Sequence, residues 1–281
     1  MDVRVWFNIC LICYHTLAAE SVCGKLLFAT TQSIMEVDVD TQSVTELVEL
    51  GGIDVMSLDY DYENKYVYFP RIQRGDIVRF HYPSQNITLQ HVVNTSFAVV
   101  VGIAVDSAND HVYWVTDSGN TLSRCKSDGT NLVVFNCFSG TVKIRLDVKN
   151  RWMYIVYYNK GISKSRLNTT DIGMIVNFTS SNTVWVDTMD IDLKEQRLYW
   201  MNTNGDIKSA DVVGYDVKTI ISINSFSIAI GVSDSCIYFA NNTQLFMTTK
   251  SQDSTPTVLY NDNNTIYTIY AFTSTGMLIA I

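Results

Sequence analysis

The chain has 281 residues, of which 47% are hydrophobic and only 17% are charged. This composition excludes a disordered chain or a coiled coil, and a chain of this length can bury a sizeable core. The net charge of −8 and the pI of about 4.9 make nucleic acid and anionic membranes poor partners, because an acidic surface repels phosphate.

Residues 1–19 are predicted to be a secretory signal peptide. Arg4 supplies the positive start, Val5–Leu17 forms an apolar run, and Ala18 and Ala19 are the small residues that cleavage needs. This run is too short to cross a membrane, and no later stretch reaches the ~18 apolar residues of a spanning helix. We therefore expect residues 23–281 to be an exported domain without direct membrane insertion.

A hairpin pattern then repeats along the chain. Each copy has Asp, a polar residue three positions later, an apolar residue at position six and Tyr at position seven. The four clear copies are Asp61–Tyr68, Asp106–Tyr113, Asp147–Tyr154 and Asp192–Tyr199. Weaker copies around Leu27 and Tyr238 extend the series to six, spaced 39 to 45 residues apart. This period, with a strand-rich composition, is typical of propeller blades of four antiparallel strands.

Each repeat is expected to begin with an innermost strand, followed by the Asp turn, the Tyr strand, a polar hairpin and two further strands. The innermost strands are predicted at 102–105, 144–146, 189–191 and 228–230, and one fourth strand at 132–135. The copy at Leu27 lacks an innermost strand, whereas Ile266–Phe272 resembles an innermost strand with nothing after it. We expect the N- and C-terminal segments to complete the first blade together, because closure hides both open edges.

The aspartates of the repeat have a structural interpretation. Their identical position in every copy spreads them around the ring, which does not suit a shared metal ion. Each is expected to accept hydrogen bonds within its own turn. These structural aspartates are Asp61, Asp106, Asp147 and Asp192.

Cysteines and sequons agree with export. Cys23, Cys125, Cys137 and Cys236 remain after removal of the signal, and they allow up to two disulfides with three possible pairings. The glycosylation candidates, each the Asn of an Asn-x-Ser/Thr sequon, are Asn86, Asn94, Asn168, Asn177, Asn241 and Asn263.

The repeat resembles a known family. The Asp-x6-Tyr spacing, the pairs Tyr113–Trp114 and Tyr199–Trp200, and the turn Ser127–Asn131 are similar to low-density-lipoprotein-receptor class B (YWTD) repeats of lipoprotein receptors and nidogen. The resemblance covers Cys23 to Phe272, although no intact Tyr-Trp-Thr-Asp occurs. It implies an all-β, six-bladed β-propeller. It also implies extracellular binding of a signalling, matrix or lipoprotein-type protein, by a secreted domain or a piece of a longer receptor chain.

The sequence does not predict an enzyme. It lacks a nucleophile elbow, a His-x-x-x-His pair and a phosphate loop, and it suggests no cofactor. The alternative, a calcium-dependent lactonase-like hydrolase, needs oxygen ligands that converge from the innermost strands. Asp59, Arg145 and Asp190 are the charged candidates there, and an arginine suits a cation cage poorly. A pH switch at His81, His91 or His111 is a further hypothesis, with ordinary surface histidines as the alternative.

A binding patch is predicted on the face that carries the polar hairpins. Tyr157, Tyr158 and Lys160 come from the hairpin of the fourth repeat, and Trp185 from the link that follows. Exposed aromatic residues beside a charge are typical interface anchors. The alternative is that these rings pack between blades. Sequons at Asn94, Asn241 and Asn263 fall on the same face, toward other blades.

Overall fold

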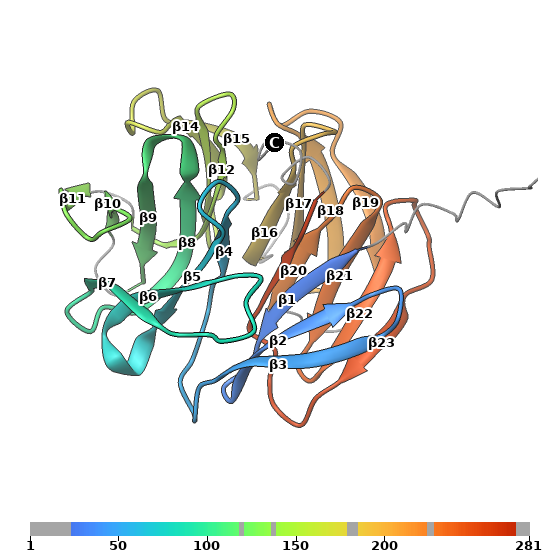
Figure 1. Ribbon diagram of the computed structural model, residues 1–281. Helices are drawn as coiled ribbons and strands as arrows, with labels where there is room; N and C mark the ends of the chain where they lie inside the picture. Colours follow the sequence, from blue (N-terminus) through green and yellow to red (C-terminus); the bar gives the residue numbers. More distant parts are fainter. Residues whose placement is uncertain (1–23, 118–120, 136–138, 179–184, 224–227, 274–281) are drawn as a thin grey trace, which may run out of the picture.

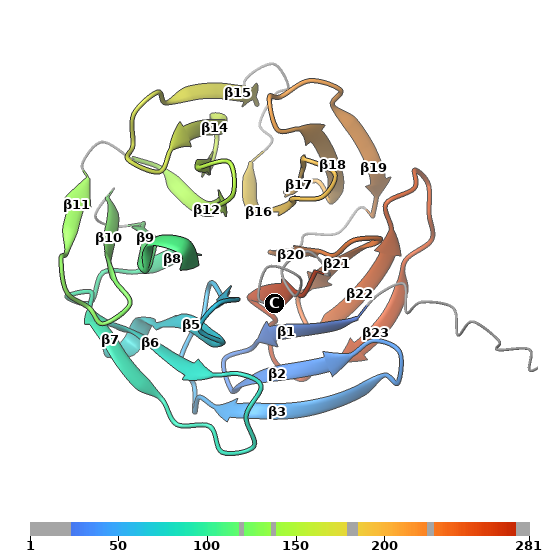
Figure 2. The ribbon, with the colours of Figure 1, turned by 45° about the horizontal axis from the view of Figure 1, so that its top comes forward.

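Six four-stranded antiparallel sheets form a closed ring in the computed structural model (Figures 1 and 2). We use the word channel for the region at the centre of the ring that the innermost strands surround. The structure describes residues 24–117, 121–135, 139–178, 185–223 and 228–273. The signal segment, Cys23 and Cys137 lie outside these ranges. The prediction of a six-bladed β-propeller with four strands per blade is confirmed.

The strands follow one another from the channel outward in every blade. Blade 1 contains β24 (Thr268–Ala271), β1 (Lys25–Ala29), β2 (Ser33–Asp38) and β3 (Ser43–Glu49). Blade 2 contains β4 (Asp59–Asp61), β5 (Tyr66–Arg71), β6 (Asp76–His81) and β7 (Gln90–Asn94). Blade 3 contains β8 (Val100–Asp106), β9 (His111–Thr116), β10 (Leu122–Lys126) and β11 (Val133–Phe135).

The second half of the ring repeats this order. Blade 4 contains β12 (Thr141–Asp147), β13 (Trp152–Tyr157), β14 (Gly161–Arg166) and β15 (Gly173–Asn177). Blade 5 contains β16 (Val186–Asp192), β17 (Arg197–Asn202), β18 (Asp206–Asp211) and β19 (Lys218–Ser222). Blade 6 contains β20 (Ala229–Val232), β21 (Cys236–Asn241), β22 (Gln244–Thr249) and β23 (Thr257–Asn261). Two short 3₁₀ turns, Ile72–Arg74 and Ser107–Asn109, occupy loops.

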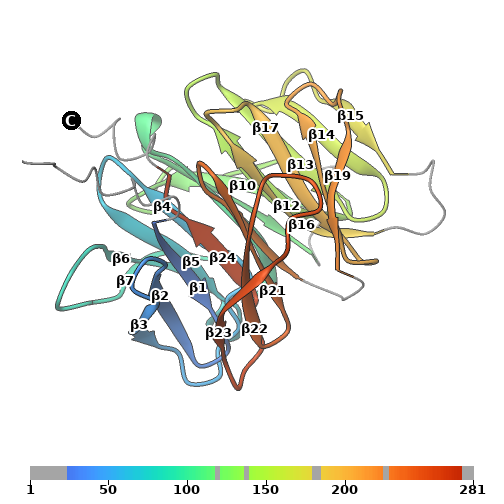
Figure 3. The same cartoon turned by 90° about the vertical axis from the view of Figure 1, so that its right-hand side faces the viewer.

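The two ends of the described chain lie in one sheet. β24 pairs antiparallel with β1, and Leu27 stands opposite Tyr270 (Figure 3). Phe272 also donates its backbone N–H to the carbonyl of Lys25, at 3.2 Å.

The repeated tyrosines fill the spaces between sheets. All are at most 2% exposed: Tyr68, Tyr113, Tyr154, Tyr199 and Tyr238. Each second strand is apolar along most of its length, because both faces of an inner sheet are covered by neighbouring blades. The core is therefore distributed around the ring in clusters shared by adjacent blades.

Two of the innermost strands begin three residues earlier than predicted. β12 begins at Thr141 and β16 at Val186, three residues before the predicted starts. The added residues include polar and charged side chains, which an apolar pattern does not recognise as strand. Each extension also contains a shift in register, between Thr141 and Lys143 and between Val186 and Thr188.

The antiparallel order gives the ring two distinct faces. Turns between second and third strands emerge on the same side as the links between blades, and we call this side the hairpin face. Turns between first and second strands, with the repeated aspartates, emerge on the opposite side, which we call the Asp-turn face.

Candidate protein-binding face

Two aromatic side chains stack on the hairpin face between blades 4 and 5. The rings of Tyr158 and Trp185 have centroids 5.2 Å apart and planes at 26°. Backbone hydrogen bonds fix both residues, since Val186 N–H donates to Tyr158 and Thr203 N–H donates to Trp185, at 3.0 and 2.9 Å. Trp185 nevertheless remains 44% exposed. The pair is therefore a rigid, partly exposed aromatic surface.

The other two residues of the predicted patch behave differently. Lys160 is exposed, and its backbone carbonyl accepts from Phe178 N–H at 2.9 Å. Tyr157 is half-buried and packs into the core shared by blades 3 and 4, which raises the pKa of its hydroxyl by burial. Tyr158 follows the last residue of β13, and its ring lies against Trp185 in the link to blade 5, whereas the ring of Tyr157 packs toward blade 3. The structure brings Tyr158 and Trp185 together and assigns Tyr157 to inter-blade packing.

A groove of about 330 Å³ begins beside this pair and runs down the flank between blades 4 and 5. Two of its lining residues, Val186 and Asn202, precede or follow in sequence the hydrogen-bonded residues Trp185 and Thr203, so this end of the groove lies at the hairpin face. Asn177, one of the sequon asparagines, lines the same groove. The sequence analysis placed the sequons Asn94, Asn241 and Asn263 of this face toward other blades. Asn177 is a fourth sequon, and it lies in the same sector as the predicted patch.

The central channel contains a network of charged side chains. Arg145 Nε lies 2.7 Å from an oxygen of Asp190, joining blades 4 and 5. Asp59 accepts from Val105 N–H at 2.6 Å, and Asp190 accepts from Val232 N–H at 2.8 Å. Carboxylates of the innermost strands thus bind the innermost strand of the next blade.

Lys143 and Asp187 belong to this network although sequence analysis missed them. Lys143 is 3% exposed and donates from Nζ to the carbonyl of Met56 at 3.0 Å. Burial lowers the pKa of Lys143 to about 7, and burial raises that of Asp187, which the nearby Lys143 partly offsets. Lys143 stands two residues before Arg145, on the same face of β12, so strand alternation is the signal that points to it.

The channel does not suit a metal ion. Among the residues that the structure describes, no group of three or more His, Cys, Asp or Glu side chains is placed to hold one. Lysine and arginine are interleaved with the carboxylates, and both cations compete with any metal for the same oxygens.

The repeated aspartates lie in the turns predicted for them. Asp61 accepts from the backbone N–H groups of Glu63 and Asn64, and Asp192 from those of Lys194 and Glu195, at 2.8 to 3.1 Å. All four carboxylates are at most 2% exposed: Asp61, Asp106, Asp147 and Asp192.

Three of these aspartates also bind the following blade. Asp106 meets Arg151 at 2.8 Å, and Asp147 accepts from Gln196 at 3.2 Å. Asp192 pairs with Lys250. The turns therefore connect neighbouring blades as well as closing their own hairpins.

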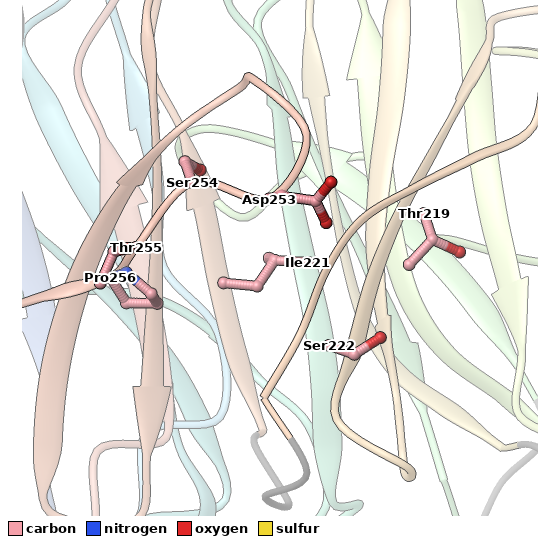
Figure 4. Close-up of a pocket in the computed structure, with 7 residues that line it drawn as sticks. All are labelled: Thr219, Ile221, Ser222, Asp253, Ser254, Thr255 and Pro256. Atoms are coloured by element: carbon pink, nitrogen blue, oxygen red, sulfur yellow. The ribbon is translucent and has the colours of Figure 1, made fainter.

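A larger hollow of about 430 Å³ lies at the outer edge between blades 5 and 6 (Figure 4). Hydroxyl groups line it, and Asp253 is its one ionisable side chain. The hydroxyls of Ser222 and Ser254 already donate, to Asp206 and to the carbonyl of Thr249. A single exposed carboxylate without a partner base or nucleophile offers no catalytic arrangement.

The cysteine and histidine candidates are separated in space. Cys125 has a free, buried thiol, and burial raises its pKa to about 12, so this candidate is not a disulfide cysteine here. Cys236 is disulfide-bonded. His81 and His91 are exposed in blade 2, and burial with the neighbouring Arg124 lowers the pKa of His111 in blade 3.

The described chain contains no helix with the length and apolar character needed to cross a bilayer.

The sequon asparagines are divided between the two faces. Asn86 and Asn168 lie in loops of the Asp-turn face, whereas Asn94, Asn177 and Asn241 end strands at the hairpin face. Asn263 lies in the link between blade 6 and β24.

These features define a six-bladed β-propeller that carries an Asp-x6-Tyr repeat. The chain is similar to a vitellogenin receptor of Solenopsis invicta, with 23% identity over 237 residues that cover 80% of this chain. It spans 13% of the length of that receptor. No family model matches the sequence.

A solved structure has the same fold. The chain resembles a protein in the crystal structure of a nidogen/laminin complex, with a TM-score of 0.78 and 16% identity over 88% of this chain and 98% of the other. The resemblance to YWTD propellers that the repeat predicted is confirmed by these two likenesses.

Proposed function

We propose that the chain is an extracellular, non-enzymatic binding module that holds a secreted or matrix protein on its hairpin face. The observation that carries this proposal is the partly exposed stacked pair Tyr158–Trp185. Rigid aromatic side chains lose little entropy on binding and are common energetic anchors of protein interfaces. Lys160, exposed in the adjacent turn, supplies a charge at the rim.

The similar proteins support this assignment. One is named a receptor, and the other is seen in a complex of nidogen and laminin. Both names describe recognition of one protein by another. Export through a signal peptide at residues 1–19, disulfide formation and N-glycosylation at sequons other than Asn177, which lines the groove, belong to the same proposal. The channel network, with its interleaved cations, gives no support to a lactonase-like hydrolase.

The test compares Trp185→Ala with Phe97→Ala, a second exposed aromatic on the hairpin face. Phe97 is 74% exposed, in the link between blades 2 and 3. The immobilised chain is exposed to extracellular fluid, to purified vitellogenin and to laminin. Proteins retained by the wild type and by Phe97→Ala are expected to be lost by Trp185→Ala, with unchanged circular dichroism. Equal retention by both variants would refute the patch, and unfolding of Trp185→Ala would assign the ring to packing.

A further inference from the structure

Exposed apolar side chains are concentrated on one half of the ring. Of eleven large hydrophobic residues that are exposed in the described structure, nine belong to blades 3 to 5 or to the links that join these three blades. Five of these nine lie on the outer hairpins of blades 4 and 5, and we call them the outer patch. The outer patch consists of Ile172, Met174, Val213, Tyr215 and Val217, all 47% exposed or more.

A knob and a groove lie side by side in this region. The turn of blade 5 that carries Tyr215 lies against β15 of blade 4, because a Cβ added to Gly214 would come within 1.9 Å of the carbonyl oxygen of Ile175. Gly214 and Val217, on either side of Tyr215, line the flank groove with Ile175. Tyr215 itself is 75% exposed, the most exposed large hydrophobic residue described.

Charge divides the ring in the same way. Residues 100–223, which form blades 3 to 5, contain 13 basic and 13 acidic described residues. The remaining described residues contain 6 basic and 13 acidic ones, so the acidity of the chain lies on blades 1, 2 and 6. Two copies that meet through the acidic half repel each other, whereas contact through blades 4 and 5 carries no such penalty.

We infer that a second copy of this chain covers the outer patch in a two-fold dimer, with Tyr215 of each copy in the flank groove of the other. A two-fold interface requires one surface to be complementary to itself, and an adjacent knob and groove meet this condition. In such a dimer each copy inserts its Tyr215 into the groove of the other. Both contact surfaces are then used, so the assembly does not grow beyond two copies. The dimer displays two Tyr158–Trp185 pairs, although the inference does not depend on their function.

The test is the oligomeric state of the whole chain, produced without N-glycans because Asn177 lines the groove. Sedimentation velocity over the micromolar range is expected to show a dimer. Tyr215→Glu, which puts a charge into the apolar contact, is expected to give a monomer with an unchanged melting temperature. Val258→Glu, at an exposed apolar position of blade 6, is the matched control and stays dimeric.

A crosslinking measurement locates the contact. A photoreactive phenylalanine analogue in place of Tyr215 is expected to crosslink to the partner's peptide that contains β15. A monomeric wild type, a dimer that persists in Tyr215→Glu, or crosslinks confined to other blades would each overturn the inference.

Discussion

Asp59 shows how one channel carboxylate couples pH to folding. Burial raises the pKa of Asp59 to about 6, against the opposing effect of Arg145 and the hydrogen bond from Val105. In the unfolded chain the pKa returns to its ordinary value of 3.8. The ionised form therefore opposes folding, and the stability that Asp59 contributes below pH 4 is lost as pH rises through 6.

Asp59→Asn is accordingly expected to raise the melting temperature at pH 8 more than at pH 4. The amide keeps a carbonyl oxygen for Val105 N–H and removes the buried charge. Lys143→Met is the control of opposite sign. The pKa of Lys143 is lowered in the folded protein, so burial of its charged form destabilises the fold, and this cost is complete below pH 7. Lys143→Met is therefore expected to raise the melting temperature more at pH 6 than at pH 10. Equal shifts at both pH values would contradict the assignment.

At the scale of elements, one position of the Asp turn supplies a donor to the turn aspartate of the preceding blade at two of the blade junctions. Arg151 and Gln196 stand four residues after their own turn aspartates and reach back to Asp106 and Asp147 of the preceding blade. Both have positive φ, 62° and 52°. In blade 3 the same position holds Asp110, also with positive φ, which cannot donate to the turn of blade 2.

Arg151→Ala is expected to destabilise the protein by about 2 kcal/mol, because it leaves the fully buried carboxylate of Asp106 short of a donor. Urea unfolding measures this loss. Lys149→Ala, at an exposed position of the same turn, is the control and should leave the transition unchanged. A similar loss in both variants would mean that the ion pair contributes little.

Asp110→Arg is expected to have the opposite effect, a gain of about 1 kcal/mol. Arginine already adopts the required backbone conformation at position 151, and at position 110 it would face Asp61 of blade 2. The melting temperature measures the gain, and Asp61→Asn in the same background should abolish it.

Repetition explains how much of these elements the sequence predicts. Four copies of Asp-x6-Tyr and two weaker copies of the same hairpin predict the blades, their strands and the buried tyrosines, because each copy independently reports the same local structure. The pairing of Tyr158 with Trp185 depends on the link between two blades, which has no repeat. Lys143 and Asp187 were missed because an apolar pattern ends where a strand turns polar toward the channel. The role of Arg151 was missed because its partner lies 45 residues away.

At the scale of the whole molecule, blades 1 and 2 meet through aromatic rings. Tyr60 of β4 contacts Tyr270 and Phe272 of the C-terminal segment, with ring centroids 6.3 and 5.2 Å apart. Tyr82 stacks on Phe272 at 5.4 Å. The last described segment of the chain therefore packs simultaneously against its own blade and the next one.

Phe272→Ala is expected to destabilise the fold by about 3 kcal/mol, since it removes a ring that is 7% exposed from three aromatic contacts. Guanidinium unfolding followed by Trp fluorescence measures it. Val258→Ala, in the exposed outer strand of blade 6, is the control with little expected change. If Phe272→Ala unfolds like the wild type, the C-terminal rings do not hold the two blades together.

The pairing of β24 with β1 has a mechanical consequence. Lys25 and Phe272 lie at the same end of this antiparallel pair, so tension applied between them pulls the strands apart sideways. The rungs of the ladder then break one after another instead of sharing the load. If the domain is part of a longer chain under tension, blade 1 is therefore expected to open at low force, by separation of β24 from β1, while the other five sheets stay intact.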